Sequence, residues 1–195
     1  MTTQFLPILV FVVVMVCWFA FGGIFLFRRK PPSPPDQKRD PSSIPGVALQ
    51  CLSYGIVWGL RREAFTSFSS QSMVALIGSM VAVLAALSSV WLIMTAVKTL
   101  GKEWSVTARL VEAHELAVSG PYAYVRHPIY TGMLGMLLAT GIAVSYWQAL
   151  VVALLVFLVG TIIRVRSEES LLRGAFGEKF DEYRHRVSAL IPGLY

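Results

Sequence analysis

The chain has 195 residues, of which 55% are hydrophobic and 14% are charged, and its mean hydropathy is +0.64. This composition excludes an ordinary soluble globular protein and predicts an integral membrane protein, and the length allows one domain. The net charge of +6 is accompanied by no basic motif of a nucleic-acid-binding module. We therefore attribute it to orientation in the membrane and to attraction by anionic lipid headgroups.

Three apolar segments of the first half are predicted to span the membrane. Phe5–Phe27 contains no charged residue, exceeds the apolar core of a signal peptide and lacks a small-residue cleavage site. Ile44–Leu60 is short and contains Gln50, so we expect a helix inside a bundle rather than one that faces lipid. Met73–Val97 is a second clear span. Residues 28–44, which are rich in proline and charge, are predicted to form an extended linker.

The polar segment from Lys98 to Tyr124 is predicted to be a loop or a short surface element, because Ser-Gly-Pro at 119–121 breaks any helix there. It leads into the motif Arg126-His-Pro-Ile-Tyr-Thr-Gly132, in which Pro128 suits an early position of a helix. The N-terminus of that helix would favour an anionic group such as a ligand carboxylate. The alternative is a membrane-surface anchor with an aromatic belt of Tyr122, Tyr124 and Tyr130.

An uncharged stretch of 31 residues follows, Met133–Ile163. As one helix it would be roughly 46 Å long, well over the roughly 30 Å thickness of the hydrocarbon core. Folded at its polar middle, Ser145–Gln148, it becomes a hairpin of two spans of about 24 Å, Pro128–Val144 and Gln148–Ile163. The hairpin returns the chain to the side it left, so the polar clusters that flank it should share one membrane surface.

Beyond Ile163 the sequence becomes charged and amphipathic. The hairpin should bring Glu168 to Tyr130, whereas the simpler alternative places Glu168 and Glu169 on a solvated helix face. A helix lying on or capping the cytoplasmic face is predicted, with a break near Gly174 or Gly177. Its apolar stripe at helical spacing consists of Leu172, Phe176, Phe180, Tyr183 and Val187.

The basic residues support five spans. With the N-terminus outside, 15 of the 17 Lys and Arg residues fall in segments predicted to be cytoplasmic, and only Arg61 and Arg62 fall outside. We therefore predict an all-α integral membrane protein with five transmembrane helices, the N-terminus out, the C-terminus in and an interfacial C-terminal helix. Its single domain, 1–195, comprises three spans with their linker at 1–97, followed by the loop, hairpin and amphipathic helix at 98–195.

In this order and spacing, the motifs resemble the signature of the isoprenylcysteine carboxyl methyltransferase family, much of which the related phospholipid N-methyltransferases share. The short chain resembles a small, prokaryotic-type member. The matching pieces are His114-x-Leu116, Gly120-Pro-Tyr122, Arg126-His-Pro-x-Tyr130-x-Gly132, Arg164, Glu168-Glu-Ser-Leu-Leu172 and Phe176-Gly177.

The resemblance implies an S-adenosylmethionine-dependent methyltransferase, similar to protein-S-isoprenylcysteine O-methyltransferase, with S-adenosylhomocysteine as the product. Its active site would face the cytoplasm, and a lipidic or lipidated methyl acceptor would enter from the bilayer. Arg164 and Arg126 would be catalytic, with Arg164 facing a substrate carboxylate. No His or Cys pair has zinc spacing, so no metal is expected. The implied cofactor-binding residues are His114, Glu115, Leu116, Ala117, Tyr122, His127, Pro128, Ile129, Tyr130 and Glu168.

Three functions stay open from the sequence. The first is carboxyl O-methylation of an isoprenylcysteine-like or other lipidic acid, whose carboxylate is ionised near neutral pH and needs no general base. The second is N-methylation of a phospholipid headgroup amine, for which Glu168, Glu169 or His127 would act as the base. The third is a non-catalytic membrane module. Arg164 favours the first, because it would attract an anionic acceptor and repel a cationic one.

Overall fold

The computed structural model of the chain describes residues 5–26, 36–62, 73–101, 104–105, 109–111 and 115–193. The regular elements in these ranges are mostly helical, with one short pair of strands. The helices are α1 (Phe5–Leu26), α2 (Ile44–Gly59), α3 (Met73–Leu100), α4 (Pro128–Val144), α5 (Trp147–Phe176) and α6 (Glu178–Arg186). The remaining elements are the strands β1 (Asp36–Arg39) and β2 (Arg109–Val111) and the 3-10 turns η2 (Pro41–Ser43) and η4 (Gly120–Ala123).

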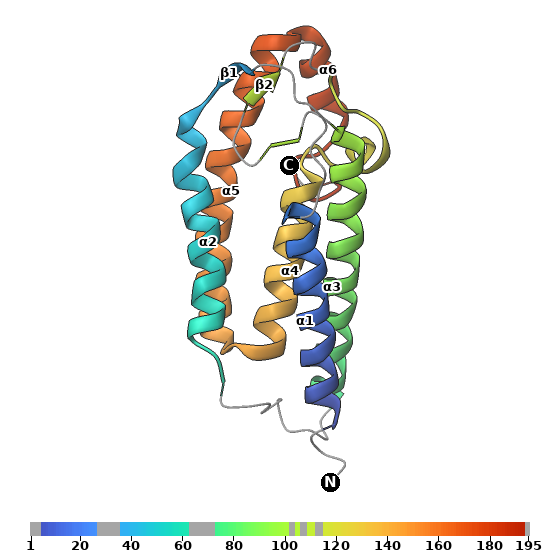
Figure 1. Cartoon of the computed structure of the whole chain (residues 1–195), viewed down its shortest axis with the longest axis vertical. Coiled ribbons are helices and arrows are strands. Elements are labelled where there is room, and N and C mark those ends of the chain that lie inside the picture. The colour runs from blue at the N-terminus through green and yellow to red at the C-terminus, as the bar shows by residue number, and fades with distance from the viewer. Residues whose placement is uncertain are drawn as a thin grey trace.

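Helices α1 to α5 run side by side along the long axis of the molecule (Figure 1). Helix α2 packs along α5, and α3 packs along both α4 and α1. The strands and α6 lie at one end of this bundle, which we call the α6 end, and the turn between α4 and α5 lies at the other (Figure 1). The described parts of the predicted linker and loop thus gather with the C-terminal helix at one end.

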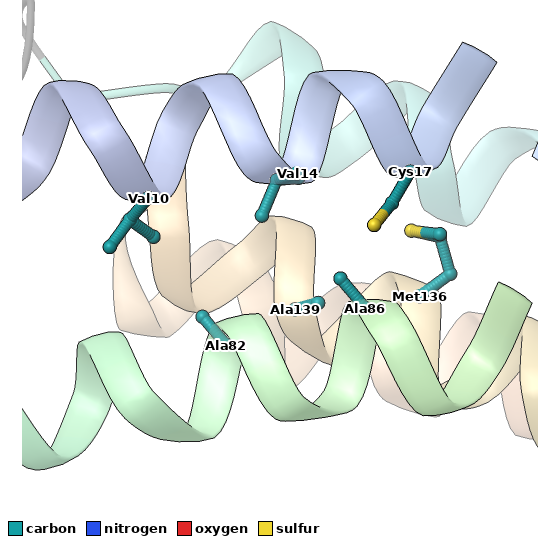
Figure 2. Close-up of a cluster of buried hydrophobic side chains, with 7 residues drawn as sticks. All are labelled: Val10, Val14, Cys17, Ala82, Ala86, Met136 and Ala139. Atoms are coloured by element: carbon teal, nitrogen blue, oxygen red, sulfur yellow. The ribbon is translucent and has the colours of Figure 1, made fainter. Parts of the chain in front are cut away.

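Small side chains allow α1, α3 and α4 to approach closely. Ala82 and Ala86 of α3 and Ala139 of α4 are fully buried and face Val14 of α1 (Figure 2). Interfaces of membrane helices are enriched in such small residues, because lipid supplies no hydrophobic force between helices and close packing must replace it. The complete buried cluster consists of Val10, Val14, Cys17, Ala82, Ala86, Met136 and Ala139.

The outward faces of the bundle are apolar. Among the described helices, α1, α3 and α5 are long and apolar enough to cross a membrane, whereas α4 is a shorter apolar helix. Large side chains such as Phe19, Leu84 and Leu155 are exposed on these three helices. Contiguous exposed apolar surface of this kind suits contact with lipid rather than water. All five predicted helices are present, and the crossing by α2 and α4 and the orientation of the bundle stay predictions.

The hairpin turn lies where the sequence predicts it, at Ser145 and Tyr146 between α4 and α5. The Ser145 hydroxyl donates a hydrogen bond to the Leu60 carbonyl at 2.9 Å, and the Arg62 amide donates to the Val144 carbonyl at 2.9 Å. The end of α2 is therefore fastened to the hairpin at the end of the bundle opposite α6.

The end of the second hairpin helix differs from the prediction. Helix α5 continues past Ile163 to Phe176, so the charged residues after Ile163 belong to the same helix as the apolar span. Residues 168–173, Glu-Glu-Ser-Leu-Leu-Arg, are mostly good helix formers and contain no Pro or Gly, which explains the continuation. The helix ends before Gly177, whose φ of +53° favours glycine. Of the predicted amphipathic stripe, Leu172 and Phe176 lie in α5, Phe180 and Tyr183 lie in the nine residues of α6, and Val187 follows α6.

The short sheet was not predicted. Strand β1 comes from the expected linker and pairs antiparallel with β2 from the expected loop, with Arg39 opposite Arg109. The strands have four and three residues, too few to show an alternation of polar and apolar side chains, and they lie far apart in sequence. Directly after β1, Asp40 caps η2 through the Ser42 amide at 2.9 Å and accepts from the Ser167 hydroxyl of α5 at 2.6 Å. The linker end is thus tied to α5.

Candidate active site

The start of α4 is covered by the C-terminal segment of the chain. The amides of Arg126 and His127 donate to the carbonyls of Ser188 and Ala189 at 2.8 and 2.9 Å. The Thr131 hydroxyl of α4 donates to the Leu190 carbonyl at 2.6 Å. Backbone carbonyls of the same chain therefore accept from these two amides, and the attraction of an anion to the start of α4 stays a prediction.

The two sides of the hairpin meet through Tyr130 and Glu168. The Tyr130 hydroxyl, in the first turn of α4, donates a hydrogen bond to the Glu168 carboxylate of α5. The ring of His127 stacks on that of Tyr130, with 5.6 Å between ring centres and 16° between ring planes. This contact confirms the central prediction from the uncharged stretch, that its flanking polar clusters share one place.

His127 bridges two neighbouring carboxylates of α5. Its Nδ1 lies 3.4 Å from Glu168 Oε2, and its Nε2 lies 3.2 Å from Glu169 Oε1. Burial alone would lower the pKa of His127, but hydrogen bonds and charge from Glu168 and Glu169 outweigh burial and raise the pKa above its ordinary value. A protonated ring donates from both nitrogens, as this position between two carboxylates requires.

Arg126 is bound on several sides by groups of the protein. Its Nε donates to Glu169 at 2.9 Å, and its Nη1 donates to the backbone carbonyls of Arg184, at 3.1 Å, and Val187. The Arg184 side chain approaches the other oxygen of Glu169, at 3.6 Å. Arg126 and Glu169 therefore connect two parts of the chain. They join the start of α4 and the C-terminal part of α5 to α6 and to the segment that follows α6.

Arg164 enters the cluster from α5, one turn before Glu168. Its guanidinium is buried, lies 3.6 Å from Glu168 Oε1 and sits over the Tyr130 ring, 4.7 Å from the ring centre. The Nη1 group donates to Gln50 Oε1 of α2 at 2.9 Å. Arg164 thus contacts three elements, α2, α4 and α5, at the level of the predicted site.

Tyr122 also belongs near this cluster. Burial, and then the Glu168 carboxylate, raise the pKa of Tyr122 well above its ordinary value, which places the phenol in the field of Glu168. Its backbone carbonyl accepts from the Tyr183 hydroxyl of α6 at 2.6 Å. Tyr122 and Tyr130 are buried, whereas Tyr124 is 74% exposed. Of the three tyrosines, only Tyr124 has the exposure that an aromatic belt requires.

The other implied cofactor residues have more varied positions. Pro128 is buried and begins α4, and Ile129 packs with Ile93, Val97 and Trp104, towards α3. In the preceding loop, Glu115 is exposed, and Leu116 and Ala117 are half-buried. His114 lies outside the described residues. The structure therefore groups Arg126, His127, Tyr130, Arg164 and Glu168, with Tyr122 beside them.

Three further residues of the cluster were not among the implied catalytic or cofactor-binding residues. Glu169 was predicted only as a possible base for N-methylation, and the fold shows that it binds Arg126. Gln50 carried a signal, since it is a polar residue in an apolar segment. Arg184 carried none, because it is one of many charged residues on a surface helix.

Positive charge exceeds negative charge in the ion pairs of this cluster. When His127 is protonated, the cluster contains four cationic side chains against the carboxylates of Glu168 and Glu169. The cationic side chains are Arg126, His127, Arg164 and Arg184. Such a cluster favours a ligand with an anionic group. Among the described residues, no three His, Cys, Asp or Glu side chains are grouped so as to hold a metal ion.

Comparison with known proteins identifies two relatives. The chain is 32% identical over 87 residues to a protein-S-isoprenylcysteine O-methyltransferase of Schizosaccharomyces pombe, covering 45% of this chain and 37% of that protein. It is 32% identical over 114 residues to the nickel-cobalt-cadmium resistance protein NccN of Alcaligenes xylosoxydans xylosoxydans, covering 56% of this chain and 52% of that protein. The chain thus matches about half or less of the length of each relative.

The model of one protein family covers more than half of the chain. The phospholipid methyltransferase family model matches residues 77–179, which include most of α3, all of α4 and α5, and the residues that meet between the last two. This match and the first relative confirm the resemblance found in the sequence. The chain is a member of the phospholipid methyltransferase family.

Proposed function

We propose that this protein is a membrane methyltransferase that uses S-adenosylmethionine and methylates the carboxylate of an isoprenylcysteine-like or other lipidic acid. The observation that carries the proposal is the buried cluster at the α6 end, where Tyr130 and Glu168 meet beside Arg164. We further propose that the α6 end faces the cytoplasm, from which the cofactor enters, while the acceptor enters from the bilayer.

The residues present fit the cofactor chemically. S-adenosylmethionine carries an ammonium group and ribose hydroxyls, which suit a carboxylate, and a carboxylate of its own, which suits a cation. Glu168 supplies the first kind of partner and retains 25% side-chain exposure, so a ligand can reach it. The cationic side chains of the cluster supply the second kind. We propose that Glu168 and Tyr130, with His127 behind them, hold the cofactor together with Tyr122 and the loop at 114–117.

Arg164 is proposed to hold the methyl acceptor. The bound cofactor would supply an activated methyl group on a sulfonium, which passes to a carboxylate oxygen while the electron pair of the broken S–C bond stays on sulfur. Arg164 would orient the acceptor carboxylate for in-line transfer, and the apolar helices would exclude water. No side chain has to remove a proton, because a carboxylic acid is already ionised at neutral pH.

Arg126 is proposed to act in a different way from the prediction. Its guanidinium binds Glu169 and the carbonyls of Arg184 and Val187, and it is 8% exposed. These partners favour a positioning residue, one that holds the start of α4 against the C-terminal segment and so fixes His127 and Tyr130.

N-methylation of a phospholipid headgroup is the second candidate, and the description of the matching family favours it. An ammonium acceptor must lose a proton before transfer, so this reaction needs a base. Glu168 is the candidate in the cluster, although Tyr130, His127 and Arg164 already bind its carboxylate. The positive excess of the cluster disfavours a cationic acceptor and favours the carboxylate reaction.

Transfer of radiolabelled methyl from S-adenosylmethionine tests the proposal. Purified protein in mixed micelles is offered N-acetyl-S-farnesylcysteine or phosphatidylethanolamine. Label that mild base releases as methanol identifies a methyl ester, whereas stable label in the phospholipid identifies N-methylation. Label in neither acceptor, from protein shown to be folded, contradicts the proposal, and label only in the phospholipid replaces the first reaction by the second.

Two substitutions separate the proposed roles of Arg164 and Glu168. Arg164→Gln should reduce ester formation far more than it reduces affinity for S-adenosylhomocysteine, because it removes the charge that faces the acceptor. Glu168→Gln should weaken cofactor binding directly. Equal losses of both properties in Arg164→Gln would count against Arg164 as the acceptor residue.

A further inference from the structure

Gln50 of α2 reaches the candidate site from outside the family match at 77–179. Its side chain is 1% exposed, and both ends of its carboxamide are bound to α5. The oxygen accepts from Arg164 Nη1 at 2.9 Å, and the nitrogen donates to the Thr161 hydroxyl at 2.9 Å. A guanidinium can only donate, so the carboxamide oxygen must face Arg164 and the nitrogen is left for Thr161.

Glycines bring α2 close enough for this contact. A Cβ on Gly46 would lie 2.5 Å from Cγ of Arg164 and 2.6 Å from the carbonyl oxygen of Gly160. The side chain of Arg164 therefore passes directly over the backbone of α2, one turn before Gln50. The α2 backbone limits the path of the side chain, and the Gln50 oxygen fixes one edge of its guanidinium.

Packing of α2 against α5 does not by itself require the hydrogen bond between Gln50 and Arg164. The bond between Gln50 and Thr161 would join α2 to α5 without any role for Arg164. The oxygen of Gln50 is instead bound to a guanidinium that also contacts Glu168, at 3.6 Å, and the Tyr130 ring. Gln50 therefore belongs to the same network as the residues that carry the proposed function.

We propose that Gln50 is a positioning residue that orients Arg164 towards the anionic group of the methyl acceptor. Because its carboxamide is neutral, Gln50 holds the guanidinium without cancelling its charge. A carboxylate in the same place would hold Arg164 equally well, but it would add a second negative charge to a guanidinium that already lies 3.6 Å from Glu168. This inference rests on the proposed function, and it assigns to α2 a share in acceptor selection.

The charge of residue 50 therefore provides the test. Gln50→Glu keeps the size of the side chain and an acceptor for Arg164 but adds a negative charge, which the neighbouring guanidinium keeps ionised. Gln50→Met removes the hydrogen bond and adds no charge. Thr161→Val is the matched control, because it removes the other partner of Gln50 and leaves the bond to Arg164 in place.

Equilibrium binding of N-acetyl-S-farnesylcysteine and of its methyl ester measures the preference for an anion. The wild type and Thr161→Val should bind the acid about tenfold more tightly than the uncharged ester, since a charge-assisted contact is worth about that factor. Gln50→Glu should lose this preference, and Gln50→Met should reduce it. The dissociation constant of S-adenosylhomocysteine should stay within about twofold of wild type in all three variants.

An unchanged preference for the acid in Gln50→Glu would overturn the inference, as would an equal loss in Thr161→Val, which would indicate packing alone. A wild type without any preference for the acid would overturn it too. Failure of the proposed function has a different signature, because the wild type would then neither bind S-adenosylhomocysteine nor transfer methyl. Melting temperatures of the variants in detergent show whether each one is folded.

Discussion

Glu168 and Glu169 are adjacent on α5 but have different partners. Glu168 binds Tyr130 and Arg164, which belong to the proposed cofactor and acceptor sites. Glu169 binds Arg126 and Arg184, which fasten the C-terminal segment. His127 contacts both carboxylates and so links the residues of the proposed ligand sites to those that fasten the C-terminal segment.

The charge on His127 should make stability depend on pH. Its pKa in the folded protein is raised above the ordinary value of 6.5, so its ion pairs contribute fully below about pH 6.5 and are lost as pH rises through the folded pKa. Melting temperatures of wild type and His127→Gln, measured in detergent from pH 6 to pH 9, should therefore converge as pH increases. A difference that stays constant or widens would show that the charge is not the stabilising feature.

At the scale of helices, close contact between α2 and α5 positions Arg164. Gly46 and Gly160 face each other, with the Gly46 oxygen 2.8 Å from where a Cβ of Gly160 would be. The sequence suggested that Ile44–Leu60 lies inside a bundle, because the segment is short and contains Gln50. It could not show which glycine of this segment meets α5, because that depends on the register between two helices far apart in sequence.

Gly46 and Gly55 provide a matched pair within α2. Gly46→Ala should force α2 away from Arg164 and lower stability by about 1–3 kcal/mol, the usual cost of overpacking. It should also lower methyl transfer, because Arg164 moves. A Cβ on Gly55 would have no other atom within 4 Å, so Gly55→Ala should leave the activity unchanged and the melting temperature unchanged or slightly raised. Thermal unfolding and the label assay measure both effects, and equal behaviour of the two variants would contradict the close contact.

Gly174 and Gly177 make a second pair, at the end of α5. The sequence indicated a break near either residue, and the structure places it at Gly177, whose φ is +53°, whereas Gly174 is helical. Gly177→Ala should cost on the order of 1–3 kcal/mol, since the conformation is strained for any residue with a Cβ. Gly174→Ala should be neutral or stabilising. Comparable losses of melting temperature in both variants would contradict this assignment.

For the whole molecule, the sequence predicted most of the architecture because apolar length and turn residues are local properties. The bounds of α4 and the meeting of Tyr130 with Glu168 followed from one uncharged stretch and its polar middle. The β1–β2 pair, the C-terminal segment over α4 and the bond from Arg164 to Gln50 did not follow. Each depends on contacts between segments far apart in sequence, and no periodic pattern encodes them.

The orientation of the whole bundle in the membrane is predicted from the sequence. The basic residues predict that α6 is cytoplasmic and that the turn between α4 and α5 is outside. In a chain with Cys17→Ala and Cys51→Ala, an impermeant maleimide should label Tyr146→Cys in intact cells. It should label Lys179→Cys only after permeabilisation. Both positions are exposed and lie at opposite ends of the bundle. The reverse labelling pattern would show that the orientation is opposite to the predicted one. Labelling of both cysteines in intact cells would contradict their placement on opposite sides of the membrane.

The hairpin between α4 and α5 is proposed to assemble a cofactor site, and calorimetric titration with S-adenosylhomocysteine measures binding to that site. Folded wild-type protein should bind one equivalent. Glu168→Ala should weaken binding at least about tenfold, because a hydrogen-bonded charge is lost from the site. Arg173→Ala, at an exposed position of the same helix, should bind as the wild type does. Absence of binding to folded wild type, or equal affinity in Glu168→Ala, would contradict a cofactor site between α4 and α5.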